Sequence, residues 1–181
     1  MRHLAVVLFA LLFALPSCAA IPRAPKVPNV GRIKVVIDRD FGPYGIEMAI
    51  KGINMWHESA GVCFDISVED VSTDNYTWAD DEVSTIYFAR DGWRAYVFEK
   101  LAGDRPVAGM TLFPMRDIFL PSNINKMRQL VAHEMGHVLG IMEHSENRMS
   151  IMYYLAWGGP QSILYEDAKM VADLLPNHRC R

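Results

Sequence analysis

The sequence has little cysteine and no strong excess of charge of either sign. Its 181 residues include three Cys, and 18 Lys and Arg stand against 21 Asp and Glu. Without a basic excess the chain lacks the electrostatic signature of a nucleic-acid-binding protein, and it carries no acidic tail. A chain of this length can bury a sizeable core, so its fold needs no framework of disulfides or metals.

The sequence also lacks internal repeats, low-complexity tracts and any apolar run long enough to span a membrane. Its longest apolar run covers residues 4–15 and follows a short basic start. A membrane span needs about 20 such residues. The layout is instead typical of a secretory signal peptide over residues 1–17, which predicts export to the periplasm, the cell surface or the medium.

The end of this leader leaves two outcomes open. The letters LPSC, which end at Cys18, resemble a bacterial lipobox, and that resemblance implies cleavage before Cys18 and a lipid on its sulfur. Such an anchor would be the only contact with a membrane. Ordinary cleavage after Ala19 or Ala20 would instead release a soluble protein. Three prolines follow closely, so residues 18–30 are predicted to form an extended linker.

Cys63 and Cys180 are the two Cys in the predicted domain. In an oxidising compartment they could form a disulfide. The alternative is a buried thiol in a strand at Cys63 and a free thiol near the end of the chain at Cys180.

Hydrophobic periodicity predicts one α+β domain over residues 31–181. The expected strands cover residues 33–38, 64–69, 85–89, 108–113 and 117–120. The expected helices cover residues 44–59, 123–139 and 163–175. Ser162 is the predicted N-cap of the last helix, and the polar text of residues 72–82 indicates a loop.

The letters HEMGH at residues 133–137 carry the clearest chemical signal. His133 and His137 are four residues apart on an expected helix, so both imidazoles lie on one face and can reach a single ion. Zinc suits such ligands because it favours imidazole nitrogen and tetrahedral coordination. Glu134 stands beside the first ligand, where it can take a proton from a zinc-activated water.

Gly140 and His144 extend this signal. A helix that ends near Gly140 needs a residue at positive φ, which glycine adopts cheaply. The chain can then double back, and His144 lies only seven residues after His137. The sequence therefore predicts one catalytic Zn²⁺ with three histidine ligands.

These residues resemble the metzincin zinc peptidases, whose pattern His-Glu-x-x-His-x-x-Gly-x-x-His precedes a Met-turn. The letters HSENRMSIMYY at residues 144–154 are most similar to the matrixin branch. The resemblance implies a zinc-dependent endopeptidase with a twisted, mostly parallel sheet, an active-site helix and a C-terminal helix. It also implies the site roles: zinc ligands His133, His137 and His144, general base Glu134, and Met152 as the apolar floor beneath the zinc.

The sequence departs from the family pattern at the third ligand. Three residues after the glycine it has Glu143, and His144 comes one residue later. Either the turn holds an extra residue and His144 binds, or Glu143 binds as a carboxylate; the spacing to Met152 favours His144. Tyr154, two residues past Met152, could reach the zinc or the oxyanion as in astacin-like and serralysin-like relatives, or could pack on the pocket wall.

The resemblance also implies a peptide or protein substrate that lies extended along an edge strand, for which residues 108–113 are the candidate. Calcium could bind Asp80, Asp81 and Glu82, although a solvated acidic loop is the favoured interpretation. A hypothesis from another class is a catalytically inactive, metzincin-like lipoprotein that binds a partner through the same cleft.

Overall fold

The structure is a computed structural model that describes most of the chain from residue 31 onward. It covers residues 31–71, 82–90, 92–103, 107–113, 116–121, 126–154, 161–178 and 180. The predicted signal peptide, the lipidation at Cys18 and the linker lie outside the described residues. So does most of the acidic loop, with Asp80 and Asp81 of the suggested calcium ligands.

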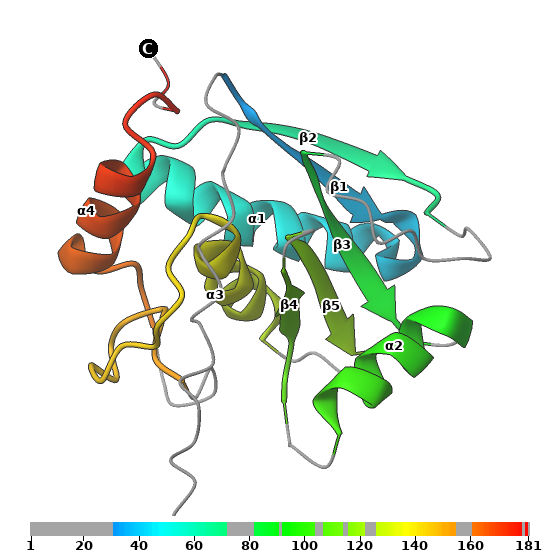
Figure 1. Ribbon diagram of the computed structural model, residues 1–181. Coiled ribbons are helices and arrows are strands. Elements are labelled where there is room, and N and C mark those ends of the chain that lie inside the picture. Colours follow the sequence, from blue (N-terminus) through cyan, green and yellow to red (C-terminus); the bar gives the residue numbers. More distant parts are fainter. Residues whose placement is uncertain are drawn as a thin grey trace, which may run out of the picture.

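In the part of the chain that the structure describes, the strands form a five-stranded sheet with the order β2-β1-β3-β5-β4 (Figure 1). The strands are β1 Ile33–Asp38, β2 Phe64–Glu69, β3 Val83–Ala89, β4 Met110–Leu112 and β5 Asp117–Pro121. Every neighbouring pair is parallel except β4 and β5, which are antiparallel. This confirms the predicted α+β fold with a mostly parallel sheet, and it places β4 at one edge.

The helices are α1 Gly42–Ala60, α2 Gly92–Ala102, α3 Met127–Val138 and α4 Tyr165–Leu174, with a short 3-10 turn η1 at Arg39–Phe41. Helices α1 and α3 pack so closely that Gly52 has no room for a side chain. A Cβ added there would stand 2.6 Å from the Arg128 carbonyl. The indole N–H of Trp56 donates to the Ala132 carbonyl at 2.7 Å, which joins the two helices a second time. These contacts fix the position of α3 in the fold.

The core fills the space between the sheet and these two helices. On β1, the alternate residues Ile33, Val35 and Ile37 are buried, as the period of two along a strand requires. They belong to one cluster with Ile53 and Trp56 of α1. The buried face of α3 joins the same cluster, so this helix is packed along its length.

Helix α2 was not predicted from the sequence. Arg94 holds it by pairing with Asp38, at the end of β1, and with Asp40 at 2.7 Å. Trp93 contacts the rings of Tyr87 and Phe119, with centroid distances of 5.3 and 6.2 Å. Helix α2 therefore lies against β3 and β5 (Figure 1) and buries Phe119.

Helices α4 and α3 begin at other residues than the sequence predicted. The prediction of Ser162 as N-cap is wrong, because α4 has Leu164 as its N-cap. The Leu164 N–H donates to the carboxylate of Asp167 at 3.0 Å, which is the bond that the third residue of a helix makes in a capping box, while Leu164 has no side-chain acceptor of its own. Helix α3 begins at Met127 rather than at residue 123, and residues 122–125 lie outside the described part.

Cys63 and Cys180 form a disulfide with a Cα–Cα distance of 5.2 Å. Two backbone hydrogen bonds of 2.9 Å accompany it, from Cys63 N–H to the His178 carbonyl and from Cys180 N–H to the Gly61 carbonyl. The residues after α4 are thus tied to the start of β2. Within the described residues, no helix combines the length and apolar character that crossing a membrane requires.

Candidate metal centre

Helix α3 presents the first two histidines on one face. His133 and His137 stand one turn apart, with ring centroids 5.0 Å from each other. His133 is buried and His137 is half-buried. The i, i+4 spacing of the sequence is therefore realised as two adjacent imidazoles at the C-terminal end of this helix.

The end of α3 returns the chain toward these imidazoles. Gly140 has φ of +103°, its N–H donates to the His137 carbonyl at 2.9 Å, and the Ile141 N–H donates to the Gly136 carbonyl at 3.0 Å. This pair of bonds is the Schellman arrangement, which ends a helix on a residue at positive φ. The mechanical role predicted for Gly140 is confirmed, and His144 follows four residues later.

Hydrogen bonds to backbone carbonyls fix the first two imidazoles in the same way. His133 Nδ1 lies 2.7 Å from the Ile151 carbonyl, and His137 Nδ1 lies 2.7 Å from the Ile141 carbonyl. A carbonyl can only accept, so each Nδ1 carries a hydrogen, and the neutral form of each ring has its lone pair on Nε2. Backbone carbonyls thus orient both rings and prepare their Nε2 atoms as metal ligands.

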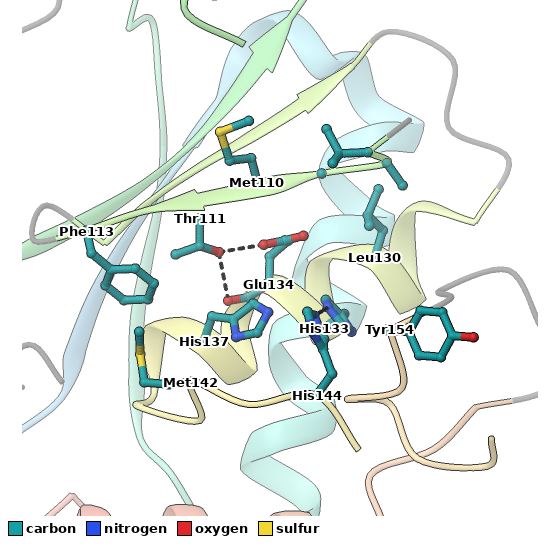
Figure 2. Close-up of a pocket in the computed structure, with 13 residues that line it drawn as sticks. Met110, Thr111, Phe113, Leu130, His133, Glu134, His137, Met142, His144 and Tyr154 are labelled. Carbon is teal, nitrogen blue, oxygen red and sulfur yellow. Dashed lines mark hydrogen bonds between the residues drawn. The ribbon is translucent and has the colours of Figure 1, made fainter. Parts of the chain in front are cut away.

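His144 completes a cluster of three imidazoles (Figure 2). Its Nε2 lies 3.2 Å from Nε2 of His133, and one ring nitrogen from each of the three histidines falls within 4.8 Å of the others. Among the residues that the structure describes, no other such group of His, Cys, Asp or Glu is found. Glu143 is exposed and is not a member.

The donor set fits zinc. Two nitrogens bound to one tetrahedral zinc at the usual bond length stand about 3.3 Å apart, and the observed separation between His133 and His144 is 3.2 Å. Burial, followed by the nearby His137, lowers the pKa of His133 to about 4. Burial likewise lowers the pKa of His144. Both rings are therefore neutral at pH 7, as metal ligation requires.

Glu134 lies beside this cluster with its carboxylate buried. Thr111 of β4 donates to Glu134 Oε2 at 2.6 Å (Figure 2). Burial raises the pKa of Glu134, while His137 and the Thr111 hydroxyl act in the opposite direction. A buried carboxylate next to a cluster of imidazoles is an arrangement suited to accepting and releasing a proton.

Met152 is buried directly against the active-site helix. A Cβ added at Gly136 would stand 2.2 Å from its Sδ and 2.9 Å from Cζ2 of Trp56. Only a glycine can occupy this position without displacing its neighbours. Met152 therefore lies at the turn of α3 between the first two histidines, in keeping with the apolar floor that the resemblance implies.

The turn that carries Met152 is anchored to α4. Ser150 Oγ donates to the buried Asp167 carboxylate at 2.8 and 3.0 Å, and it accepts from the Met152 N–H at 2.9 Å. The Ile151 N–H donates to the Ser162 carbonyl at 2.7 Å. The Ile151 carbonyl also accepts from His133, so the hydrogen bonds that anchor this turn also help to position the histidine cluster.

A cavity of about 360 Å³ opens above the cluster. Its walls include the three histidines, Glu134, residues 107–111 of the β4 segment, Leu130 and Tyr154. Tyr154 is 60% exposed, and in Figure 2 its hydroxyl points away from the histidines. The side chain lies at the rim of the cavity, and its role stays a prediction.

Sequence reasoning identified the histidines and Glu134 but missed the residues that hold them. Gly136 could have been found from the sequence. A glycine inside a helix lowers its stability by about 1 kcal/mol relative to alanine, so its presence indicates that a neighbour packs closely there. Thr111 and the Ser150–Asp167 pair had none, because their significance depends on partners 23 and 17 residues away.

The chain matches a known protein family. The family model described as Matrixin, Peptidase_M10, matches residues 49–174, which is more than two thirds of the chain. The matched segment runs from within α1 to the last residue of α4 and contains the whole cluster. No curated protein matches the chain.

Proposed function

The chain belongs to the matrixin family of zinc metallopeptidases, and on that premise we propose that it is an active endopeptidase with Glu134 as its general base. The observation that carries the proposal is the convergence of three imidazoles beside one buried carboxylate (Figure 2). A surface pair of histidines would lack both the backbone carbonyls that orient the rings and the anchored turn beneath them.

In this proposal His133, His137 and His144 hold the zinc. When bound, zinc polarises the scissile carbonyl and lowers the pKa of a water molecule. The Ile151 and Ile141 carbonyls keep two of the rings in the tautomer that ligates through Nε2. The exposed Glu143 has no part in binding, and Met152 supports the site from below.

Glu134 moves the proton. Its carboxylate accepts a proton from the attacking water and delivers it to the amine that leaves. A raised pKa, caused by burial, suits a group that must both take and release a proton near neutral pH. Tyr154 is proposed to assist at the oxyanion, which would require its hydroxyl to turn inward.

The substrate is proposed to lie extended along β4. Among the described strands β4 is at the edge of the sheet and pairs with β5 alone, and residues 107–111 line the cavity. An added strand is the general way in which such an edge binds a peptide. Side-chain preference would then be set by the cavity beside Leu130 and the histidines.

We propose further that the domain works outside the cytoplasm, either released or anchored through lipid on Cys18. The Cys63–Cys180 disulfide supports export, because such bonds persist in oxidising compartments. Metabolic labelling with a fatty-acid probe distinguishes the two forms. Label on the wild type that is absent from Cys18→Ser indicates an anchor, and no label on either indicates release.

The deciding experiment compares Glu134→Gln with Glu143→Gln in the zinc-loaded protein. We expect Glu134→Gln to bind one zinc and to lose cleavage of casein by at least about 100-fold, while Glu143→Gln keeps both. Cleavage at the full rate by Glu134→Gln would refute the mechanism. A zinc-loaded wild type that cleaves no peptide would favour the inactive binding module.

The ligand assignment has its own test. His144→Ala should lose zinc under dialysis conditions in which Glu143→Ala keeps it. The reverse pattern would make Glu143 the third ligand and would require the turn after Gly140 to be rearranged.

A further inference from the structure

Thr111 makes a contact with Glu134 that the metal site itself does not require. It is the middle residue of β4, and its hydroxyl lies 2.6 Å from Glu134 Oε2 and 3.2 Å from the Glu134 backbone carbonyl (Figure 2). Both partners are acceptors and a hydroxyl has a single hydrogen, so the nearer carboxylate oxygen takes most of the bond. A hydrogen bond to an ionised group is among the strongest that a side chain makes.

The same segment confines the other oxygen of this carboxylate. A Cβ added at Gly109 would stand 2.9 Å from Glu134 Oε1, so the bare backbone before β4 lies directly against it. Glu134 is only 5% exposed. With Thr111 on Oε2 and Gly109 beside Oε1, the edge strand restricts rotation of the carboxylate.

On the proposed function, in which Glu134 is the general base, we propose that Thr111 is the positioning residue that fixes the Glu134 carboxylate. The hydroxyl holds Oε2 and the Gly109 backbone confines Oε1, so the carboxylate keeps one orientation at the wall of the cavity. Thr111 thereby links two parts of the reaction, because its backbone belongs to the strand proposed to pair with substrate while its side chain holds the base. Thr111 touches neither zinc nor the scissile bond in this role.

Thr111→Val tests the role with little change of shape. Valine replaces the hydroxyl by a methyl group and suits a strand, so β4 should form normally. The buried carboxylate then loses its donor and can rotate. Misplacing a reacting group by about 1 Å can cost about 100-fold in rate. We therefore expect kcat to fall about 10- to 100-fold, with KM within about threefold and zinc content unchanged, since neither depends on the hydroxyl.

Thr111→Ser is the matched control, because it restores the hydroxyl on a smaller side chain. We expect it to recover kcat to within about threefold of the wild type, as the charge-assisted bond can re-form. A role confined to packing would give the opposite order, with valine the milder change. Thr111→Val in a Glu134→Gln background should add nothing to the loss already caused by Glu134→Gln. A further fall there would overturn the proposal.

A readout independent of turnover separates this proposal from the proposed function. Crystal structures of the zinc-loaded proteins should show one Glu134 conformer in the wild type and in Thr111→Ser. In Thr111→Val the Glu134 carboxylate should be rotated or should occupy two conformers. If wild type and Glu134→Gln cleave equally or not at all, the proposed function fails, and the conformer of Glu134 alone decides whether Thr111 positions it. An unmoved carboxylate with an unchanged kcat in Thr111→Val would overturn the inference.

Discussion

Gly136→Ala should destabilise the protein even though alanine is the better helix former. Elsewhere in a helix interior this exchange gains about 1 kcal/mol. Here the new Cβ would lie 2.2 Å from Sδ of Met152 and 2.9 Å from Cζ2 of Trp56. Met152 is 1% exposed and Trp56 is fully buried, so neither has open space to enter. The indole is also held by its bond to Ala132.

The magnitude follows from two opposed terms. Overpacking of a close-packed interior costs about 1–3 kcal/mol and occasionally more, and the helix gain offsets about 1 kcal/mol of that. We expect a net loss of up to about 2 kcal/mol in the free energy of unfolding. A displaced Met152 also moves the turn that holds His133, so zinc affinity should fall as well.

The assay is urea unfolding of the metal-free protein, in the presence of a chelator, for a double-mutant cycle with Met152→Ala. Met152→Ala alone should cost about 2–5 kcal/mol because it leaves a cavity. In that background the clash with Met152 is gone and only the 2.9 Å contact with Trp56 remains, so Gly136→Ala should be clearly less destabilising than in the wild type. The difference between the two backgrounds measures the coupling between Gly136 and Met152. A stabilising Gly136→Ala in the wild-type background would refute the close contact between α3 and the turn below it.

Three further predictions concern the supports of the site. Asp167→Ala should lower the free energy of unfolding by about 3 kcal/mol, because it removes a buried charged acceptor from two donors. Asp173→Ala, on the exposed face of the same helix, is the control and should lower it by less than about 0.5 kcal/mol. Thermal unfolding of both variants measures the difference. Reduction of the disulfide, which spans 117 residues, should lower stability by about 3–5 kcal/mol through the entropy of the unfolded chain, and unfolding with and without reductant measures it. Metal-free protein should lose stability as the pH falls from about 6.5 to 4. His133 has its pKa depressed to about 4, so only the unfolded chain takes up that proton in this window, which corresponds to about 3 kcal/mol. The His133→Gln variant should show a weaker dependence, and an identical pH profile for both proteins would contradict the argument.

The parts of the structure that the sequence predicted are those encoded by local spacing. The i, i+4 histidines and Gly140 define one helix face and its end, and a period of two defines β1 and β2. These relations hold whatever packs against them. The disulfide was one of two open alternatives, because pairing depends on a distance that spacing does not supply.

The parts that the sequence did not predict depend on distant partners. Helix α2 has no single apolar stripe, since Trp93 packs against the sheet while Arg94 reaches residues more than 50 positions earlier. Ser162 failed as a cap because its backbone bonds to the turn of Met152, and Asp167 serves both α4 and that turn. Thr111 became significant only when the sheet order placed β4 beside α3.

The disulfide closes most of the domain into a covalent ring. Every element from β2 to α4 lies between Cys63 and Cys180 in the sequence, and so do the three histidines of the cluster. One nick anywhere in that stretch leaves two pieces that remain attached to each other. If the proposed peptidase activity cuts neighbouring copies of the protein, the cut molecules will migrate with intact ones on a gel until reductant is added. Such autolysis must therefore be measured on reduced samples, because under oxidising conditions a nicked molecule keeps its two pieces together.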